Sequence, residues 1–389
     1  MLSNRIDTLS ESITIAISTL AAELKASGKD VLSFSAGEPD FDTPQVIKDS
    51  AIKAINDGFT KYTAVDGIPE LKSAVAKKLQ RDNSLTYSND QIIISNGAKH
   101  SLFNLFQTTI NKGDEVIIPA PFWVTYPELV TYCEGTPVAV ATTEETGFKM
   151  TAQMLKAAIT PKTKMLVLTS PSNPTGSIYS KEELQALAEV LKGTDILVAS
   201  DEMYEKLTYD GDFTSAASIS ADMYQRTITI NGLSKSVAMT GWRFGYLATS
   251  DKTLVKAMKK LQSQSTSNIN SVTQIAAITG LDGSADEDIA MMRKAFIERR
   301  NTAVELFNAV EGLSVLKPDG AFYLFVNINA IESDSMKFCK QLLEEKGVAV
   351  VPGVGFGSEG YFRFSFATGI ETIKDGISRI ESFIKSNYK

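Results

Sequence analysis

Between about residues 90 and 250, short apolar runs rich in β-branched residues alternate with stretches in which apolar residues recur at helical spacing. One such stretch, at 181–192, repeats leucine and alanine on a single helical face. Because this alternation is typical of parallel strands joined by helical crossovers, it predicts an α/β fold with a mostly parallel sheet flanked by helices. The expected buried strands lie at residues 91–95, 116–119, 165–169, 196–200, 227–230 and 246–249.

After residue 285 the pattern changes to strands mixed with longer helices, which predicts a second, smaller α+β domain. The first 45 residues have no counterpart in the larger pattern and are expected to pack with this C-terminal part. We therefore expect a large domain at 46–285 and a small domain made of 1–45 and 286–389. The elements expected in the C-terminal part are strands at 322–327, 348–351 and 361–366 and helices at about 286–310, 335–346 and 370–386.

Several classes of protein are disfavoured by the composition. A formal net charge of -7, without a dense Lys/Arg run, argues against a nucleic-acid surface. No apolar segment is long enough to span a membrane, and the first 20 residues do not have the pattern of a signal peptide. The two cysteines, Cys133 and Cys339, lie far apart and outside any CxxC motif, so we expect no metal site and a reducing, cytoplasmic compartment.

The chain has one histidine, His100, which restricts the available catalytic chemistry. A Ser-His-Asp or Cys-His arrangement is excluded unless His100 is the base, so proton transfer must be sought among lysine, tyrosine and carboxylates. Lys235 is the leading candidate, because it follows the strand at 227–230 and sits among small and apolar residues. A poorly hydrated lysine has a lowered pKa and can form a Schiff base with an aldehyde. The alternative is a structural lysine in a loop after a strand.

Two features are consistent with a phosphate site. Gly97 lies between the strand at 91–95 and a helical run, where backbone N–H groups and the helix dipole favour an anion. Arg243 follows Lys235 by eight positions, and an arginine there could bind a phosphate with two hydrogen bonds. For the glycine alone, the alternative is an ordinary turn between a strand and a helix.

Further polar and aromatic residues lie close after predicted strands, where ligands bind in open α/β sheets. Asp201 could hold a protonated ring nitrogen, or it could cap the next helix. Asn173 lies between two prolines, which fix the direction of its amide. Trp123 could stack on a planar cofactor, although a core tryptophan is the commoner case. Arg363 alternates with aromatic residues and needs an anionic partner, either a substrate carboxylate or an internal ion pair.

A glycine motif at 355–360 matches G-x-G-x-x-G but precedes a strand rather than a helix. A dinucleotide site requires the order strand, glycines, helix, so we reject NAD binding.

The order of these features resembles that of the fold-type I, pyridoxal-phosphate-dependent aminotransferases of class I/II. The chain is most similar to their bacterial aspartate aminotransferase subgroup, and the resemblance covers almost its whole length. It implies the fold of that group and an enzyme that uses pyridoxal 5'-phosphate. The segments that carry the resemblance are 35–44, 61–63, 67–72, 170–176, 200–204, 234–246 and 319–323.

The resemblance implies a role for each matching residue around the cofactor ring. Lys235 would carry the internal aldimine and shuttle a proton between the substrate Cα and the cofactor C4′. Asp201 would keep the pyridine nitrogen protonated, which makes the ring an electron sink. Asn173 and Tyr204 would contact the phenolic oxygen, and Trp123 would stack on the ring.

The same resemblance implies the remaining binding sites and a homodimer whose active sites are shared. Arg363 would hold the substrate α-carboxylate, helped by Asn173, Trp123 and the Gly37 backbone. The N-terminal segment, through Ser12 and Thr14, would close over the ligand. The cofactor phosphate would be held by Gly97, Ala98, Lys99, Ser234 and Arg243, with Tyr62 reaching in from the second subunit.

The resemblance also predicts the substrates. Lys99 matches a position that meets the distal carboxylate in this subgroup, and a cation there suits dicarboxylates. The alternative is that Lys99 faces solvent at the start of the helix. The expected reaction moves the amino group of aspartate to 2-oxoglutarate and gives oxaloacetate and glutamate. The alternatives are an aromatic, alanine or prephenate-accepting aminotransferase on the same scaffold, or a β-elimination lyase. A non-catalytic cofactor-binding regulator would need an additional DNA-binding domain, for which the residues before 36–39 leave no room.

Overall fold

The computed structural model describes residues 2–10 and 13–388, and its centre is a seven-stranded sheet in the order β2-β8-β7-β6-β5-β3-β4. Only β8 runs antiparallel to its neighbours, β2 and β7, so the predicted mostly parallel α/β sheet is confirmed. The strands are β2 (Ile92–Ser95), β3 (Glu115–Ala120), β4 (Thr136–Ala141), β5 (Thr163–Thr169), β6 (Leu197–Asp201), β7 (Thr227–Gly232) and β8 (Gly245–Thr249).

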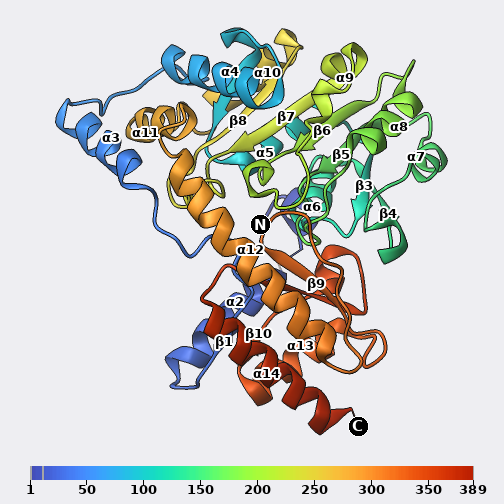
Figure 1. The fold of residues 1–389 in the computed structure, drawn as a ribbon. Helices are drawn as coiled ribbons and strands as arrows, with labels where there is room; N and C mark the ends of the chain where they lie inside the picture. The colour runs from blue at the N-terminus through green and yellow to red at the C-terminus, as the bar shows by residue number, and fades with distance from the viewer. Residues whose placement is uncertain (1, 11–12, 389) are drawn as a thin grey trace.

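Helices cover both faces of this sheet (Figure 1). Along β2, Ile93 packs on the same face as α5, whereas Ile92 and Ile94 pack with α4 on the other face, as the alternation of side chains along a strand requires. Ser180 begins α8 with a capping box that includes Glu183. The helices around the sheet are α3 (Gln45–Asn56), α4 (Pro69–Asn83), α5 (Ala98–Thr109), α6 (Thr125–Tyr132), α7 (Ala152–Ala158), α8 (Lys181–Leu191), α9 (Ala221–Arg226), α10 (Lys252–Ser263) and α11 (Ser271–Leu281).

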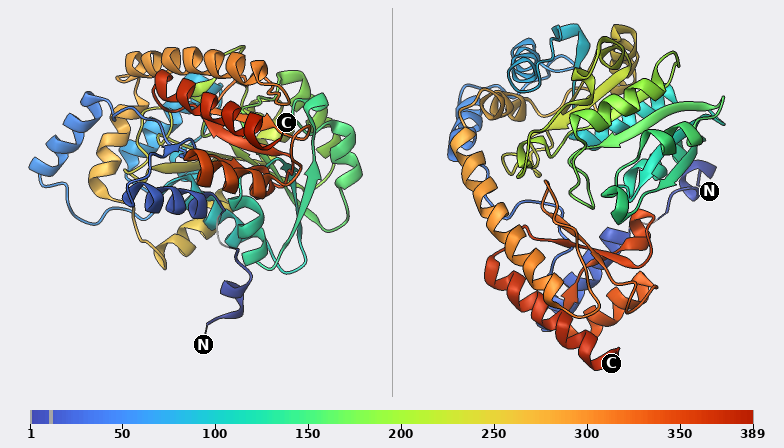
Figure 2. Two further views of the ribbon diagram at one scale, coloured as in Figure 1. Left: turned by 90° about the horizontal axis from the view of Figure 1, so that it is seen from below. Right: turned by 45° about the vertical axis from the view of Figure 1, so that its right-hand side comes forward.

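The C-terminal elements form a separate sheet with the antiparallel order β11-β12-β9. The long helix α12 (Asp286–Ala309) runs from the large sheet to these elements, which lie below the large sheet in Figure 1. Both views in Figure 2 show α14 and α13 packed beside the smaller sheet. The elements are β9 (Tyr323–Asn327), α13 (Ser335–Lys346), β11 (Val351–Pro352), β12 (Tyr361–Ser365) and α14 (Ile370–Asn387).

The N-terminal segment joins the C-terminal elements through a short parallel pair, β1 (Leu32–Ser33) with β10 (Val348–Ala349). The single strand expected at 348–351 is therefore wrong, because β10 pairs with β1 while β11 pairs with β12. Helix α2 (Ile13–Ala26) packs against this region through Ile17 and Ala21. The domain boundaries after residues 45 and 285 stay a prediction.

Helix α1 (Asn4–Asp7) lies apart from α2 and contacts α6 of the large sheet. The guanidinium of Arg5 lies 5.7 Å from the centre of the Tyr132 ring, and the backbone N–H of Ser10 donates to Glu128. The first residues thus contact the large-sheet part of the molecule, while α2 contacts the C-terminal part.

Within the described residues, no helix has the length and apolar character needed to cross a membrane. Over the same ranges, 2–10 and 13–388, no group of three or more His, Cys, Asp or Glu side chains is arranged to hold a metal ion. Cys133 and Cys339 are free thiols.

Candidate active site

A cavity of about 280 Å³ opens at the carboxyl ends of the central strands, facing the smaller sheet. The large sheet contributes Thr169 from the end of β5 and Asp201 from the end of β6, and the smaller sheet contributes Tyr323 and Arg363. The site residues predicted from the sequence that line this cavity are Gly37, Ala98, Lys99, Trp123, Asn173, Asp201, Tyr204, Ser234, Lys235, Arg243 and Arg363.

Lys235 lies in the turn between β7 and β8, and its side chain is directed into the cavity. Its Nζ donates a hydrogen bond of 2.5 Å to the Gly37 carbonyl. Burial lowers the pKa of Lys235 to about 8; the nearby Arg243 and Arg363 act in the same direction, and Glu38 opposes them. A substantial fraction of a lysine with this pKa is neutral near physiological pH, so the amine can act as a nucleophile or base.

Asp201 is buried at the end of β6 and makes polar contacts with the large-sheet part of the molecule. It accepts a 2.7 Å hydrogen bond from Tyr126 and a 3.2 Å bond from the backbone N–H of Met203. Tyr126 accepts in turn from Thr169, at 2.8 Å. Burial raises the pKa of Asp201, which these hydrogen bonds and Lys235 oppose. Asp201 precedes a short 3-10 turn, η3 (Glu205–Leu207), so the alternative of an α-helix cap is wrong.

Tyr204 and Arg363 meet at the wall formed by Tyr323. The hydroxyls of Tyr204 and Tyr323 are 2.9 Å apart, and the Arg363 guanidinium lies 4.4 Å from the centre of the Tyr323 ring. Arg363 donates to Asn173 Oδ1 at 2.9 Å and to the Ser35 carbonyl at 2.7 Å.

Arg363 is 2% exposed, and burial lowers its pKa. Among residues 2–10 and 13–388 it forms no ion pair with a carboxylate, and its buried Nε has no hydrogen-bond partner. The alternative of an internal salt bridge is therefore not observed within these residues. A buried guanidinium with a free donor and no anion suits an external carboxylate.

The start of α5 forms a concentration of hydrogen-bond donors. Gly97 has a φ of 84°, and a Cβ atom there would lie 2.4 Å from Arg243 Nη2, so only glycine allows this close approach. The first backbone N–H groups of α5, the Ser234 hydroxyl and the Arg243 guanidinium are donors around one end of the cavity. The adjacent residue Ala98 is also approached closely by the backbone at Gly245. This donor set fits a phosphate group.

Lys99 is exposed at the edge of the cavity, and its Nζ lies 4.9 Å from the centre of the Trp123 ring. Partial burial and the neighbouring Arg243 lower the pKa of Lys99. Lys99 thus both contacts solvent and lines the cavity. His100 accepts a hydrogen bond from the backbone N–H of Asn96 through Nδ1 and does not line the cavity.

Two predicted residues of the described part of the chain, Gly97 and Tyr62, do not line this cavity. The backbone N–H of Gly97 donates to the Ser95 carbonyl at 2.8 Å, while its neighbours Ala98 and Lys99 line the cavity. Tyr62 is 92% exposed and lies elsewhere on the surface. Ser12 lies outside the described residues, as does the side chain of Thr14, although the backbone of Thr14 belongs to α2. The next residue, Ile15, lines the cavity.

Two aromatic residues in the site were not predicted to have a role, Tyr126 and Tyr323. Tyr126 follows Trp123 by one helical turn, and nothing in its neighbourhood distinguishes it from a core tyrosine. The burial of Tyr126 and the charge of Asp201 hold its pKa well above the ordinary value, so it stays protonated and donates. The position of Tyr323 opposite Tyr204 depends on how the two sheets face each other.

Comparison with known proteins places these residues in a family context. The family model described as aminotransferase class I and II matches residues 29–380. An aspartate aminotransferase of Bacillus subtilis is 48% identical, with 99% of each chain covered. An aspartate/prephenate aminotransferase of Nitrosomonas europaea is 46% identical, covering 98% of this chain and 99% of the relative. The solved structure of the Thermus thermophilus aspartate aminotransferase with maleate is 40% identical, with a TM-score of 0.95 and coverage of 98% and 99%.

Proposed function

The chain belongs to the class I and II aminotransferases, and we propose that it is an aspartate aminotransferase. It moves the amino group of aspartate to 2-oxoglutarate and yields oxaloacetate and glutamate. The similarity of full-length aspartate aminotransferases supports this proposal. The observation that carries it is that Lys235, Asp201 and Arg363 line one cavity. An amine with a lowered pKa, a buried carboxylate and a buried guanidinium without an anion are the groups that the reaction requires.

We propose pyridoxal 5'-phosphate as the cofactor, because the donors and acceptors of the cavity match its functional groups. When bound, this cofactor withdraws electrons from the substrate and so favours loss of the Cα proton. Asp201, oriented by Tyr126, would keep a proton on the ring nitrogen. Asn173 and Tyr204 would hydrogen bond to the phenolic oxygen, and Trp123 would cover the ring face.

The phosphate is bound by the donors at the start of α5. Ser234 and Arg243 complete this set from the β7–β8 turn, the same segment that carries Lys235. A phosphate bound here and a ring nitrogen bound by the Asp201 carboxylate would anchor the cofactor at two ends, within reach of the Lys235 amine. The backbone N–H groups of Ala98 and Lys99 are assigned to the phosphate, whereas Gly97, whose N–H donates to Ser95, contributes by letting Arg243 approach closely.

Lys235 acts twice in the reaction. Its neutral amine would bind the aldehyde of the cofactor until the amino group of the substrate takes its place. The released Nζ would then accept the proton from the substrate Cα and donate it to C4′. A pKa of about 8 suits both transfers, since the amine and its protonated form are both populated near neutral pH.

Two cations select the substrate. Arg363 binds the α-carboxylate, assisted by Asn173 and the Gly37 backbone, and Lys99 binds the distal carboxylate. A T. thermophilus structure at 40% identity was solved with maleate, a dicarboxylate, which supports two cationic points. The N. europaea relative is named for aspartate and prephenate, so prephenate is the second candidate substrate. Ser12 and Thr14 are proposed to close over the ligand with the N-terminal segment.

We also propose a homodimer in which Tyr62 reaches the phosphate of the second subunit. Support comes from the exposure of Tyr62 and of two isoleucines on α3, Ile52 and Ile55, which are 54% and 55% exposed. A large cofactor-binding domain at 46–285 would contain the seven-stranded sheet, and a small domain made of 1–45 and 286–389 would contain the three-stranded sheet and the β1-β10 pair. The free thiols of the chain are consistent with a cytoplasmic location.

The proposed activity is tested by adding single amino acids to the cofactor-loaded protein without any 2-oxo acid. Aspartate and glutamate are expected to shift the absorbance of the bound cofactor within one half-reaction, and alanine and phenylalanine to do so far more weakly. The four donors are compared as initial rates at subsaturating concentration. A preference for phenylalanine or alanine over aspartate would overturn the assignment, and release of ammonia and pyruvate-type products without an acceptor would indicate a lyase.

Replacement of Lys99 by alanine is expected to weaken selection for dicarboxylates. The loss of a charge-assisted hydrogen bond predicts that kcat/KM for aspartate falls by about 10- to 100-fold, while that for alanine changes by less than about 3-fold. Lys112→Ala, at an exposed lysine outside the cavity, is the matched control and should leave both values unchanged. An equal loss for aspartate and alanine would remove Lys99 from this role.

A further inference from the structure

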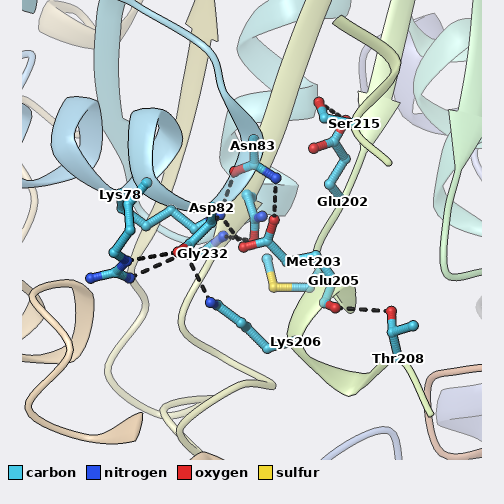
Figure 3. Close-up of polar contacts among 12 residues, drawn as sticks. Lys78, Asp82, Asn83, Glu202, Met203, Glu205, Lys206, Thr208, Ser215 and Gly232 are labelled. Atoms are coloured by element: carbon cyan, nitrogen blue, oxygen red, sulfur yellow. Dashed lines mark hydrogen bonds and ion pairs between the residues drawn. The ribbon is translucent and has the colours of Figure 1, made fainter. Parts of the chain in front are cut away.

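The last turn of α4 is bound to the η3 turn by a group of charged and polar side chains, which we call the Lys78 cluster (Figure 3). Lys78 forms an ion pair with Glu205 Oε1 and donates 2.9 Å to Asn83 Oδ1. Asn83 Nδ2 donates 3.0 Å to Glu205 Oε2. Both oxygens of Glu205 are thus held, and the three side chains form a closed ring. The members of the cluster are Lys78, Asp82, Asn83, Glu205 and Lys206.

A second ion pair binds Lys206, the next residue of the η3 turn, to α4. Lys206 Nζ lies 2.9 Å from Asp82 Oδ2, so residues 205 and 206 are both bound to the end of α4. Asp82 also pairs with Arg81, and these cations lower its pKa to about 2, although burial acts in the opposite direction. Asp82 is therefore ionised throughout the neutral range, and the contact persists there.

The residues directly before η3 include two that line the cavity. Asp201 and Tyr204 line the cavity, whereas Glu202 and Glu205 are buried and do not line it; Figure 3 shows Glu205 bound to the end of α4. Glu202 Oε1 accepts from the hydroxyls of Ser200 and Ser215, each at 2.8 Å. Glu205 is thus held through both carboxylate oxygens, whereas Glu202 is held through Oε1 alone and its buried Oε2 has no hydrogen-bond partner among the described residues.

The Lys78–Glu205 ion pair by itself adds little to the free energy of unfolding. Lys78 and Glu205 are 4% and 8% exposed, and removing two charges from water costs about as much as their attraction returns. Apart from the Asn83 amide, which would lose both partners, an apolar pair of similar volume would stabilise the fold about as well. Apolar contacts are not directional, however, so an apolar pair would not fix the position of the turn to within a few tenths of an ångström.

We propose that Glu205, held by Lys78 and Asn83, is a positioning residue for the transamination site. It acts through the backbone of the 201–207 segment and sets the orientation of Asp201 and Tyr204 toward the cofactor ring. The inference rests on the proposed function, because it concerns the same cavity. It adds a group that touches neither cofactor nor substrate, and whose removal alters the ring contacts while leaving the substrate cations intact.

The test uses the cofactor-loaded double variant Lys78→Met/Glu205→Met, which removes both charges together and leaves neither one buried and unpaired. The Asn83 amide loses both of its partners in this variant, which accounts for a modest loss of stability. We expect its thermal midpoint to stay within about 5 °C of the parent. We expect kcat for aspartate to fall about 10-fold with KM nearly unchanged, because a displaced catalytic group slows the chemical step. The pKa of the bound chromophore, read by absorbance against pH, is expected to shift by about 0.5 unit or more.

Two further variants keep the test decisive. Asp222→Asn is a control that removes the ion-pair partner of a buried arginine, Arg226, which lies directly before the start of β7. It should lower the thermal midpoint without changing the pKa of the bound chromophore. Lys206→Met breaks only the partly exposed contact to Asp82 and should change kcat and chromophore pKa in the same direction by a smaller factor, about 2-fold in kcat.

The proposal is overturned if the folded double variant keeps the parent kcat within twofold and the parent chromophore pKa within about 0.2 unit. If the double variant does not fold, Lys206→Met decides, and the proposal is then overturned if this variant keeps the parent kcat within about 1.2-fold and the parent chromophore pKa within about 0.1 unit. Failure of the proposed function would be seen separately, as the absence of aspartate turnover in the parent protein itself.

Discussion

Replacement of Lys235 by alanine is expected to lower turnover of aspartate with 2-oxoglutarate by more than about 10⁴-fold. Lys235 is the one lysine in the cavity whose burial lowers its pKa to about 8. In the proposed reaction it is both the anchor of the aldehyde and the carrier of the Cα proton, so one substitution removes two functions. The measurement is a coupled assay for oxaloacetate formation, together with the absorbance spectrum of the purified variant.

The control separates the proton transfer from the positive charge. Lys235→Arg keeps a cation in the cavity but has a pKa too high to release a proton, and a similar loss is expected. Since Glu38 and Arg243 both influence residue 235, an unchanged thermal midpoint in both variants is needed to assign the loss to chemistry. Undiminished turnover in Lys235→Ala would contradict the assignment of this residue and of the reaction.

The central sheet was predictable because strands buried on both faces are continuous apolar runs. β6 and β7 are buried along nearly their whole length, and the expected segments coincide with them closely. β4 was not predicted, because it is an edge strand whose residues are mostly half-exposed, and Pro137 weakens its pattern. The two short strands β10 and β11 were predicted as one strand, because each is defined by a different partner. β10 pairs with β1, more than 300 positions earlier in the chain, and β11 pairs with β12, about 10 positions later.

The cavity residues at strand ends were predictable for a related reason. In a parallel sheet the carboxyl ends of neighbouring strands meet, so polar residues that follow different strands come together. Asp201 and Asn173 are examples. Tyr126 and Tyr323 were not found, because their sequence neighbourhoods are those of core aromatics and their roles depend on the partner that folding brings to them. The Lys78 cluster could not be predicted for the same reason, since Lys78 and Glu205 are 127 positions apart in the sequence.

Arg363→Leu is expected to be the most damaging substitution for substrate binding. Loss of a buried, hydrogen-bonded charge partner costs about 2–5 kcal/mol, which corresponds to a fall in kcat/KM of about 30- to several thousand-fold. Because aspartate and 2-oxoglutarate both carry an α-carboxylate, both KM values should rise. The cofactor should remain bound, since Arg363 is not assigned to the phosphate. Steady-state kinetics with each substrate varied, and the absorbance of the bound cofactor, measure these effects.

Arg363→Lys tests whether charge alone explains the loss. A lysine keeps the cation but cannot form two parallel hydrogen bonds while also contacting Asn173 and Ser35, so an intermediate loss of about 10- to 100-fold is expected. A variant that loses its cofactor, or one that keeps both KM values, would contradict the role of Arg363 as the carboxylate clamp. The comparison with Lys99→Ala is then informative: Arg363 variants should weaken aspartate and alanine alike, since both donors carry the α-carboxylate, whereas loss of Lys99 should affect only the dicarboxylates.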